Sequence, residues 1–388
     1  MFASYAAAFL EVFGKRVSSA KKRVIREIVA CRTAVLGGHL ERCDKCGLER
    51  PMYDSCRNRH CPKCQGSARA KWLDAKSEDL LPVEYFHVVF TVPPAIAEIA
   101  LQNKRVMYGI LMRASAEAIK KIGADPKHLG AKIGFLSILH TWGQNMHHHP
   151  HVHCVVPGGG LSNDGKRWIA CRPGFFLPVR ILSAVFRGKF LEHVRRAFAR
   201  GELEFQGSLT DLKHTDRFEA HLEKSLAKDW VVYAKRPFGG SKQVLKYLAG
   251  YTHRVAISNH RLVSLDGGKV RFRWKDYAHG SRKRHMTLDA VEFIRRFLLH
   301  VLPRGFVRIR SYGLLANRCR VELLVRCREL LGVEESNDST SPISETATSD
   351  KAPPCPSCKT GQMIRAHRLF KVQLHRHASS TPAILDSS

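Results

Sequence analysis

The sequence predicts an α+β fold in which helices flank a central antiparallel sheet, with a small zinc-ribbon-like module before it. Two observations predict this fold class. Strand-like segments rich in β-branched residues alternate with amphipathic helices, and short loops or Gly-rich turns join several strands as hairpins. Cysteines in Cys-x2-Cys pairs crowd residues 31–66, with the spacing that is typical of zinc modules.

Composition indicates the kind of partner. The 388 residues carry 64 Lys and Arg against 34 Asp and Glu, a net charge of +30, which attracts polyanions and predicts DNA as the partner. No run of 18 apolar residues exists, so we expect no membrane span. Cys-x2-Cys pairs without a secretion signal indicate a reducing compartment, the cytoplasm, with the protein associated with the nucleoid. The oligomeric state stays open.

The chain divides into five predicted segments. Residues 1–30 form a basic helical segment in which cations alternate with apolar side chains. Residues 31–75 form the zinc-binding module, and residues 80–330 form the catalytic domain. Residues 333–353 are rich in acids, Ser and Thr and lack aromatic residues, which predicts a disordered linker. Residues 354–388 are a basic tail with a last Cys-x2-Cys pair.

Hydrophobic periodicity places the strands and helices. Strands are expected at Tyr85–Val92, Ile133–Trp142, 150–156, Arg254–Ser264 and Lys269–Trp274. Helices are expected at 68–80, 96–122, 180–200, 217–227, Lys242–Leu248 and 288–301. A short loop joins the second strand to the third, and the turn Asp266-Gly267-Gly268 joins the last two, so each pair predicts a β-hairpin.

Four cysteines give the strongest metal signal. Cys43-x2-Cys46 and Cys61-x2-Cys64 are separated by 14 residues, close to the spacing of four-cysteine zinc sites. Because a tetrahedron of thiolates selects Zn2+, these four predict one structural zinc ion. A second zinc ion has four candidate ligands, which are Cys31, His39, Cys56 and His60. Basic side chains surround both sets of candidate ligands, so we expect the zinc module to bind DNA.

Cys355-x2-Cys358 provides half of a further metal site. The sequence leaves its completion open between three histidines and two cysteines, namely His367, His375, His377, Cys319 and Cys327. A tail that binds no metal is the competing interpretation.

His151-Val152-His153 predicts a second kind of metal centre. Residues two apart on a strand point to the same face, roughly 7 Å apart, so both imidazoles can hold one ion. The preceding strand is antiparallel, which places His140 beside His153 as the expected third ligand, with Gln144 as the alternative. The run His147–His149 is interpreted as solvated loop. Hydrogen-bonded sheet histidines without a metal are the competing explanation.

Tyr247 and Tyr251 lie four residues apart, so a helix places both phenols on one face. Core packing is the ordinary explanation for such a pair. The tyrosines, however, share their neighbourhood with the cations Lys246, His253 and Arg254. Nearby cations, or a metal that polarises a phosphate, make a phenol with a pKa of about 10 competent as a nucleophile.

Three motifs together resemble one known family. H-P-H-V-H-C-V-V-P-G-G-G (149–160), Y-L-A-G-Y-T-H-R-V-A-I-S-N (247–259) and C-R-N-R-H-C-P-K-C (56–64) are similar to the two-tyrosine HUH transposases of rolling-circle insertion sequences. The resemblance covers roughly residues 20–330 and follows the family's order.

The resemblance implies a fold, an activity and a mechanism. It implies an HUH endonuclease domain that cleaves and rejoins single-stranded DNA at element ends, with Mg2+ or Mn2+ and a 5′-phosphotyrosine intermediate. Tyr247 and Tyr251 would be the nucleophiles, and the sequence leaves open which attacks first. The mechanism that we expect uses Tyr251 for the first cut and Tyr247 for the second. Arg254, or Lys246, would neutralise charge in the transition state.

Two other classes of protein compete with a transposase. A non-catalytic zinc-dependent DNA-binding protein explains the charge and the cysteines, but not an HxH strand together with paired tyrosines. A metal-dependent hydrolase that activates water needs a base, and no acidic residue lies between residue 140 and Asp164.

Overall fold

The computed structural model describes residues 1–226, 230–235, 243–244, 252, 255–277, 279–333 and 352–371. A five-stranded sheet lies at its centre, in the order β12-β4-β5-β3-β8, and every neighbouring pair is antiparallel. Its strands are β3 (Tyr85–Thr91), β4 (Phe135–Trp142), β5 (His148–Pro157), β8 (Val232–Lys235) and β12 (Ile309–Tyr312). The predicted α+β class with a central antiparallel sheet is therefore confirmed, whereas the two edge strands β8 and β12 were not predicted.

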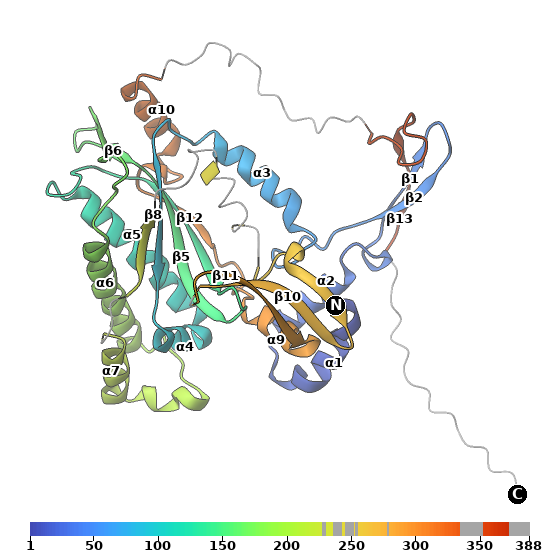
Figure 1. The fold of residues 1–388 in the computed structure, drawn as a ribbon, viewed down its shortest axis with the longest axis horizontal. Helices are drawn as coiled ribbons and strands as arrows, with labels where there is room; N and C mark the ends of the chain where they lie inside the picture. The colour runs from blue at the N-terminus through green and yellow to red at the C-terminus, as the bar shows by residue number, and fades with distance from the viewer. Residues whose placement is uncertain are drawn as a thin grey trace, which may run out of the picture.

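Four helices cover one face of this sheet (Figure 1). They are α4 (Pro94–Gln102), α5 (Lys104–Ala124), α6 (Val179–Ala199) and α7 (Thr215–Lys224). Alternate residues of the strands, such as Phe86, Val88 and Phe90 of β3, are buried against them. This packing leaves the other alternate residues on the opposite face, which the helices do not cover.

The predicted helix 96–122 is two helices, and Asn103 separates α4 from α5. Asn103 leaves the helical conformation at φ −108° and ψ 44°. Its side-chain amide donates to the carbonyl of Glu204 and accepts from the N–H of the same residue, at 2.8 and 2.7 Å. These two hydrogen bonds to a distant residue therefore interrupt the helix at Asn103, although the apolar pattern of the sequence continues through it.

The N-terminal helices α1 (Phe2–Phe13) and α2 (Ser19–Ala30) pack on a second, three-stranded antiparallel sheet, β11-β10-β9. Its strands are β9 (Leu262–Asp266), β10 (Lys269–Asp276) and β11 (Arg282–Asp289), and α9 (Ala290–Leu299) completes the layer. Phe9, Phe272 and Phe297 lie in their shared core. The first residues of the chain thus share a core with residues more than 260 positions later.

The predicted hairpin across Gly267-Gly268 is confirmed, with positive φ at both glycines (50° and 75°) as a tight turn between twisted strands requires. The predicted strand Arg254–Ser264 is wrong in its extent. Residues Asn259–Arg261 form a 3-10 turn and β9 begins at Leu262.

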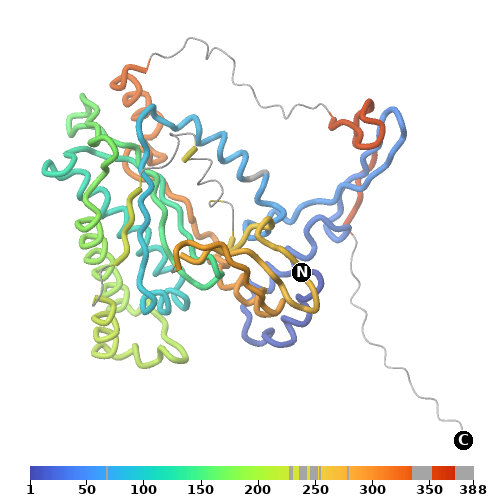
Figure 2. Tube along the Cα trace, in the orientation of Figure 1, coloured from blue at the N-terminus to red at the C-terminus, as the bar shows by residue number. Residues whose placement is uncertain are grey.

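A third sheet, β13-β1-β2, joins distant parts of the chain. The hairpin β1 (Gly38–Cys43) and β2 (Glu49–Tyr53) comes from the predicted zinc module, and β13 (Met363–Leu369) comes from the predicted tail. Figure 2 shows the blue N-terminal hairpin and the red C-terminal strand side by side. The predicted linker 333–353 lies outside the described residues except for Val333, Ala352 and Pro353.

Three smaller parts complete the described fold. Helix α3 (Gln65–Ser77) crosses the sheet face that α4–α7 leave open, with Trp72 packed beside Tyr85 and Leu136. The two-stranded sheet β6 (Gly159–Leu161) and β7 (Trp168–Ala170) and the helix α10 (Arg320–Leu330) lie at one end. No helix among these described residues is long and apolar enough to cross a membrane.

Candidate metal centres and catalytic face

Three imidazoles converge on the face of the central sheet opposite α4–α7. Strand alternation puts His151 and His153 of β5 on this face, and His140 of β4 lies directly across from His151. One ring nitrogen from each lies within 4.8 Å of the others. The ring centroids are 4.2 Å apart for His140 and His153, and 4.8 Å apart for His151 and His153.

The predicted neighbours of these histidines need correction. His140 pairs with His151, and Ile138 takes the expected place opposite His153, because the loop closes at residues 143–147 and the register shifts between His140 and Trp142. The His140 ring nevertheless leans closer to His153 than to His151, at 4.2 against 5.3 Å. Gln144, the alternative ligand, lies in the loop, and its carbonyl accepts a hydrogen bond from Arg261.

The histidine run beside the triad is not all solvated loop. Strand β5 begins at His148, and His148 Nε2 lies 2.7 Å from the hydroxyl of Tyr108, which is buried under the sheet. Burial lowers the pKa of His148 to about 3. The loop interpretation was therefore wrong for His148 and His149, which begin strand β5, although His149 is exposed; His147 is an exposed loop residue, as expected.

Burial keeps two members of the triad, His151 and His153, uncharged at neutral pH. Desolvation lowers the pKa of His151 to about 3 and that of His153 well below its ordinary value, and neighbouring imidazoles act in the same direction. A neutral imidazole has a lone pair for a metal, whereas a protonated one does not. His151 and His153 are thus in the state that a metal ligand requires.

A fourth histidine, which sequence reasoning missed, touches the triad. His87 of β3 places its Nε2 2.6 Å from Nδ1 of His153, with the two rings stacked at 4.9 Å and 6°. His151 in turn places Nδ1 2.7 Å from the carbonyl of His149. Both contacts occupy Nδ1, so Nε2 is the nitrogen that His151 and His153 can offer to an ion. Alternation along β3 places His87 on this face, but the sequence spacing does not predict that β3 pairs with β5.

The predicted nucleophiles Tyr247 and Tyr251, and Arg254, lie outside the described residues. A described residue before the tyrosines packs on the triad face. Val244 is 2% exposed and packs with Leu136, Ile138 and Val155.

Thr252 is buried, and its carbonyl accepts a hydrogen bond from the guanidinium of Arg308. The carbonyl of Arg308 accepts from the N–H of Leu139, the neighbour of His140, at 2.9 Å. Burial, reinforced by the nearby Arg59, lowers the pKa of Arg308 to about 10, so this guanidinium stays charged at neutral pH. Thr252 is thereby linked to the strand that carries His140.

Eight cysteines gather in two clusters that differ from the predicted set. The base cluster contains Cys31, Cys56, Cys61 and Cys64, and the tip cluster contains Cys43, Cys46, Cys355 and Cys358. The prediction grouped Cys43 and Cys46 with Cys61 and Cys64, which is wrong because the β1–β2 hairpin carries the first pair to its turn. The second pair stays near the start of α3, beside Cys31 at the end of α2.

The other candidate ligands lie outside both clusters. His60 has both ring nitrogens engaged, Nδ1 3.0 Å from the Asn58 side chain and Nε2 accepting from the N–H of Leu302 at 3.1 Å. His39 Nε2 lies 3.5 Å from the Glu41 carboxylate. The completing ligands considered for Cys355 and Cys358 are also wrong where they are described (His367, Cys319 and Cys327), and His375 and His377 lie outside the described residues.

Fold and sites together define an α+β protein with a cysteine-rich zinc module and a histidine triad on its sheet. The family model described as "Transposase zinc-binding domain" matches residues 1–92, and the one described as "Putative transposase" matches residues 134–322. The chain is 56% identical over 355 residues to "Putative transposase y4qJ" of Sinorhizobium fredii, covering 90% of this chain and 89% of that protein. The chain belongs to this transposase family, which confirms the predicted resemblance.

Two more distant similarities accompany this match. The "Transposase for insertion sequence element IS801" of Pseudomonas savastanoi pv. phaseolicola is 23% identical over 313 residues, covering 79% of this chain and 73% of that protein. Among solved structures, the metal-bound conjugative relaxase TrwC in complex with oriT DNA is 13% identical, with 63% of this chain and 71% of that chain covered. Its TM-score of 0.25 is too low to establish a common fold.

Proposed function

We propose that this transposase cuts and rejoins single-stranded DNA through a 5′-phosphotyrosine linkage, with Tyr251 and Tyr247 as nucleophiles. The observation that carries the proposal is the convergence of three imidazoles on one sheet face, two of which, His151 and His153, are kept neutral by burial. The anchoring of Val244 and Thr252 supports it, because these residues bracket the tyrosine segment and are tied to that same face and to the strand of His140. A purely structural histidine pair explains neither the convergence of a third imidazole nor the anchoring of the tyrosine segment beside it.

The triad fits a divalent metal ion. Three nitrogen donors lie within reach of one ion, and contacts to His87 and to the His149 carbonyl orient two of the rings. A set of imidazoles without a carboxylate suits transition ions better than Mg2+, so of Mg2+ and Mn2+ we propose Mn2+ as the better fit. When bound, the ion supplies polarisation of a phosphate oxygen and orients the phosphate.

The proposed reaction exchanges one phosphate ester for another. The phenol oxygen of Tyr251 forms a bond to phosphorus, the bond from phosphorus to the 3′ oxygen breaks, and the phenol's proton is balanced by the one that the 3′-hydroxyl gains. No water is consumed, so a 3′-hydroxyl can reverse the step and rejoin a strand. Tyr247 performs the same exchange on a second strand, and Arg254 neutralises charge on the phosphate.

The base cluster fits a structural zinc ion. Its sulfurs lie 3.5 Å apart for Cys31 and Cys64, and 3.6 Å apart for Cys56 and Cys64. A tetrahedron with Zn–S bonds of about 2.3 Å spaces its sulfurs about 3.8 Å apart. Arg59, which lies between the ligands Cys56 and Cys61, donates a hydrogen bond to the carbonyl of Phe306 in the loop that follows α9. Zinc there would hold the module against the loop that carries Arg308.

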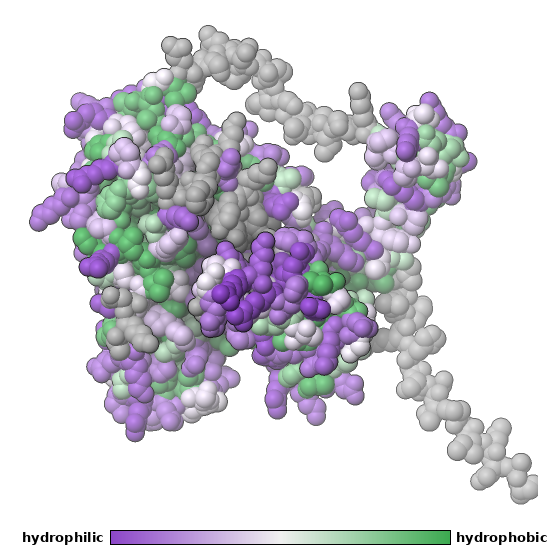
Figure 3. Space-filling model, in the orientation of Figure 1, coloured by the Kyte–Doolittle hydropathy of each residue, from purple (hydrophilic) through white to green (hydrophobic). Residues whose placement is uncertain are grey.

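The exposed side of the sheet β9–β11 fits single-stranded DNA. We call basic sheet face the side chains of Lys269, Arg271, Arg273, Lys275 and Lys283, which are exposed on β10 and β11. Figure 3 shows this strongly hydrophilic area near the centre of the view. Lys275 and Lys283 lie directly opposite each other, an arrangement that costs stability unless an anion lies over them.

One aromatic side chain at the edge of this face suits base stacking. Tyr277 is 63% exposed, and the Lys275 ammonium lies 5.2 Å from its ring centroid. Two tryptophans of the same sheets, Trp142 and Trp274, are engaged in other contacts. Trp142 stacks on His140 at 4.7 Å, and Trp274 packs against the core beneath the sheet.

Replacing Arg271, Lys275 and Lys283 together by glutamine is expected to weaken binding of single-stranded oligonucleotides. The slope of log K against log salt should fall in magnitude by about 2, since each lost phosphate contact removes about 0.7. Fluorescence anisotropy at several salt concentrations measures it. The control is the triple variant Lys213→Gln, Arg217→Gln, Lys224→Gln near α7, which removes the same exposed charge. Equal slopes for the two variants would contradict the assignment.

An oligonucleotide assay tests the proposed function as a whole. The purified chain is incubated with end-labelled single strands from the flanks of its gene, with Mn2+ or with chelator, and resolved under denaturing conditions. We expect a metal-dependent, protease-sensitive protein–DNA adduct and a free 3′-hydroxyl. Cleavage without an adduct would indicate a hydrolase that uses water, and binding without cleavage would indicate a DNA-binding protein.

A further inference from the structure

We propose that the tip cluster is a second four-thiolate zinc site, whose ligands come from both ends of the chain and which fastens the C-terminal segment to the zinc module. Cys43 and Cys46 lie within the stretch that matches the zinc-binding domain, whereas Cys355 and Cys358 lie about 260 residues beyond its last residue. The inference is independent of whether the chain cuts DNA.

The sulfur geometry is that of a metal site. Cys43 and Cys358 have their sulfurs 3.7 Å apart, and Cys46 and Cys355 have theirs 3.6 Å apart. These distances are far longer than a disulfide bond of about 2.05 Å and close to the edge of a zinc–thiolate tetrahedron. All four sulfurs lie within 4.8 Å of one another.

The two Cys-x2-Cys turns have the same backbone form. The carbonyl of Cys43 accepts from the N–H of Gly47 at 3.2 Å, and the carbonyl of Cys355 accepts from the N–H of Lys359 at 3.0 Å. Gly47 and Lys359 both have positive φ, 69° and 60°. A lysine rarely adopts this conformation, so its match to Gly47 indicates that the second turn is shaped to present two sulfurs as the first does.

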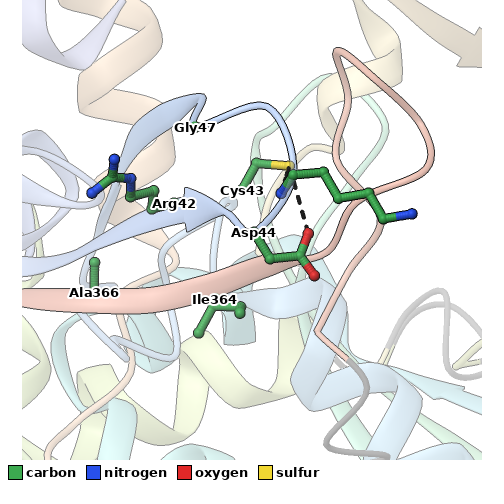
Figure 4. A pocket seen from close by; sticks show the side chains of 7 residues that line it. Arg42, Cys43, Asp44, Gly47, Ile364 and Ala366 are labelled. Atoms are coloured by element: carbon green, nitrogen blue, oxygen red, sulfur yellow. Dashed lines mark hydrogen bonds between the residues drawn. The ribbon is translucent and has the colours of Figure 1, made fainter.

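Backbone amides are aimed at the sulfurs, as thiolate ligands require. The N–H groups of Lys45 and Cys46 each lie 3.4 Å from Cys43 Sγ, and the N–H of Gly361 lies 3.3 Å from Cys358 Sγ. Gly361 is needed for the approach, because a Cβ at this position would lie 2.5 Å from Cys43 Sγ. Figure 4 shows Cys43 at the end of its strand with Asp44 directly after it, close to Ile364 of β13, while Ala366 lies further along β13.

The described C-terminal segment has too small a core to hold its place by packing. Its buried apolar residues are Cys355 and Met363, which pack with Cys43 and the partly buried Leu48. Pairing of β13 with β1, from Cys43↔Met363 to Gly38↔Leu369, extends the sheet by a single strand. Such small modules fold when a metal contributes the missing free energy. Zinc at the tip cluster would therefore hold the C-terminal segment against the β1–β2 hairpin of the zinc module.

The experiment is a zinc-content cycle on the full chain. The double variants Cys43→Ser/Cys46→Ser and Cys355→Ser/Cys358→Ser are each expected to lose one zinc ion per chain relative to the unsubstituted protein. The quadruple variant should also lose one, because both pairs hold the same ion. The matched control Cys171→Ser, a cysteine outside both clusters, should lose none. A loss of two ions in the quadruple variant, or of none in either double variant, would overturn the proposal.

A second measurement does not depend on cysteine variants that fold. A protease site is placed between Val333 and Ala352, and the chain is cleaved after purification with zinc bound. The C-terminal fragment should co-elute with the rest of the chain in size-exclusion chromatography and should separate after chelation. A fragment that separates with zinc bound, or that stays attached after the metal is removed, would refute the fastening role.

Discussion

Replacing Tyr247 and Tyr251 together by phenylalanine is expected to abolish the covalent protein–DNA adduct, with a loss of cleavage rate of about 10⁴-fold or more. The phenol oxygen is the atom that joins to phosphorus in the proposed reaction, and phenylalanine lacks it while keeping the ring. The measurement is adduct formation on a labelled single strand under denaturing conditions. Tyr53→Phe removes a phenol in the zinc module and should leave the adduct yield unchanged.

The single variants separate the two tyrosines. Tyr251→Phe should remove the first cut, whereas Tyr247→Phe should form one adduct but fail to process a second strand on the same molecule. The reverse pattern would exchange the two roles and leave the chemistry intact. An adduct that persists in the double variant would show that another residue is the nucleophile.

His151→Ala is expected to lower the cleavage rate by about 10³-fold while single-strand affinity stays within about twofold. Removing one of three donors weakens the hold on an ion that contributes several kcal/mol to the transition state, and each 1.36 kcal/mol is tenfold in rate. In the proposed function, DNA affinity rests on the basic sheet face, which lies on other strands, β10 and β11. Cleavage kinetics and anisotropy on the same preparation measure both quantities.

Two further histidine variants make this result specific. His128→Ala changes an exposed histidine outside the triad and should cleave normally. His87→Ala removes the partner of His153 but no donor, so it should raise the Mn2+ concentration for half-maximal cleavage about 10- to 100-fold and recover its rate when Mn2+ is saturating. Normal cleavage by His151→Ala would make the triad merely structural.

Local patterns were sufficient for the parts of the site that lie within one element. Alternation along a strand predicted that His151 and His153 share a face, and the structure has them so. The short loop after Trp142 predicted the β4–β5 hairpin. The predicted neighbour of His140 across the hairpin was wrong, because the loop closes early, at residues 143–147, and His140 therefore pairs with His151 and not with His153; spacing along the chain does not reveal where the loop closes.

The cysteines illustrate the same limit over a longer distance. Each Cys-x2-Cys turn was identified from its spacing, but the partner of each turn was not. Cys43 and Cys46 lie closer in sequence to Cys61 than to Cys355, yet a hairpin separates them from the first and strand pairing brings them to the second. His87 belongs to the same class, since its contact with His153 depends on which strand pairs with β3.

By itself the sequence determined the class of protein: a basic, cysteine-rich α+β transposase with an HxH strand and paired tyrosines, because composition and short motifs depend only on residue identity and local spacing. Tertiary structure alone decided which side chains meet, from the His140–His151 pairing to the union of the two chain ends in the tip cluster. The physical reason is that strand order and register follow from burying apolar faces of segments far apart in the chain, a sum over the whole fold that no single motif contains.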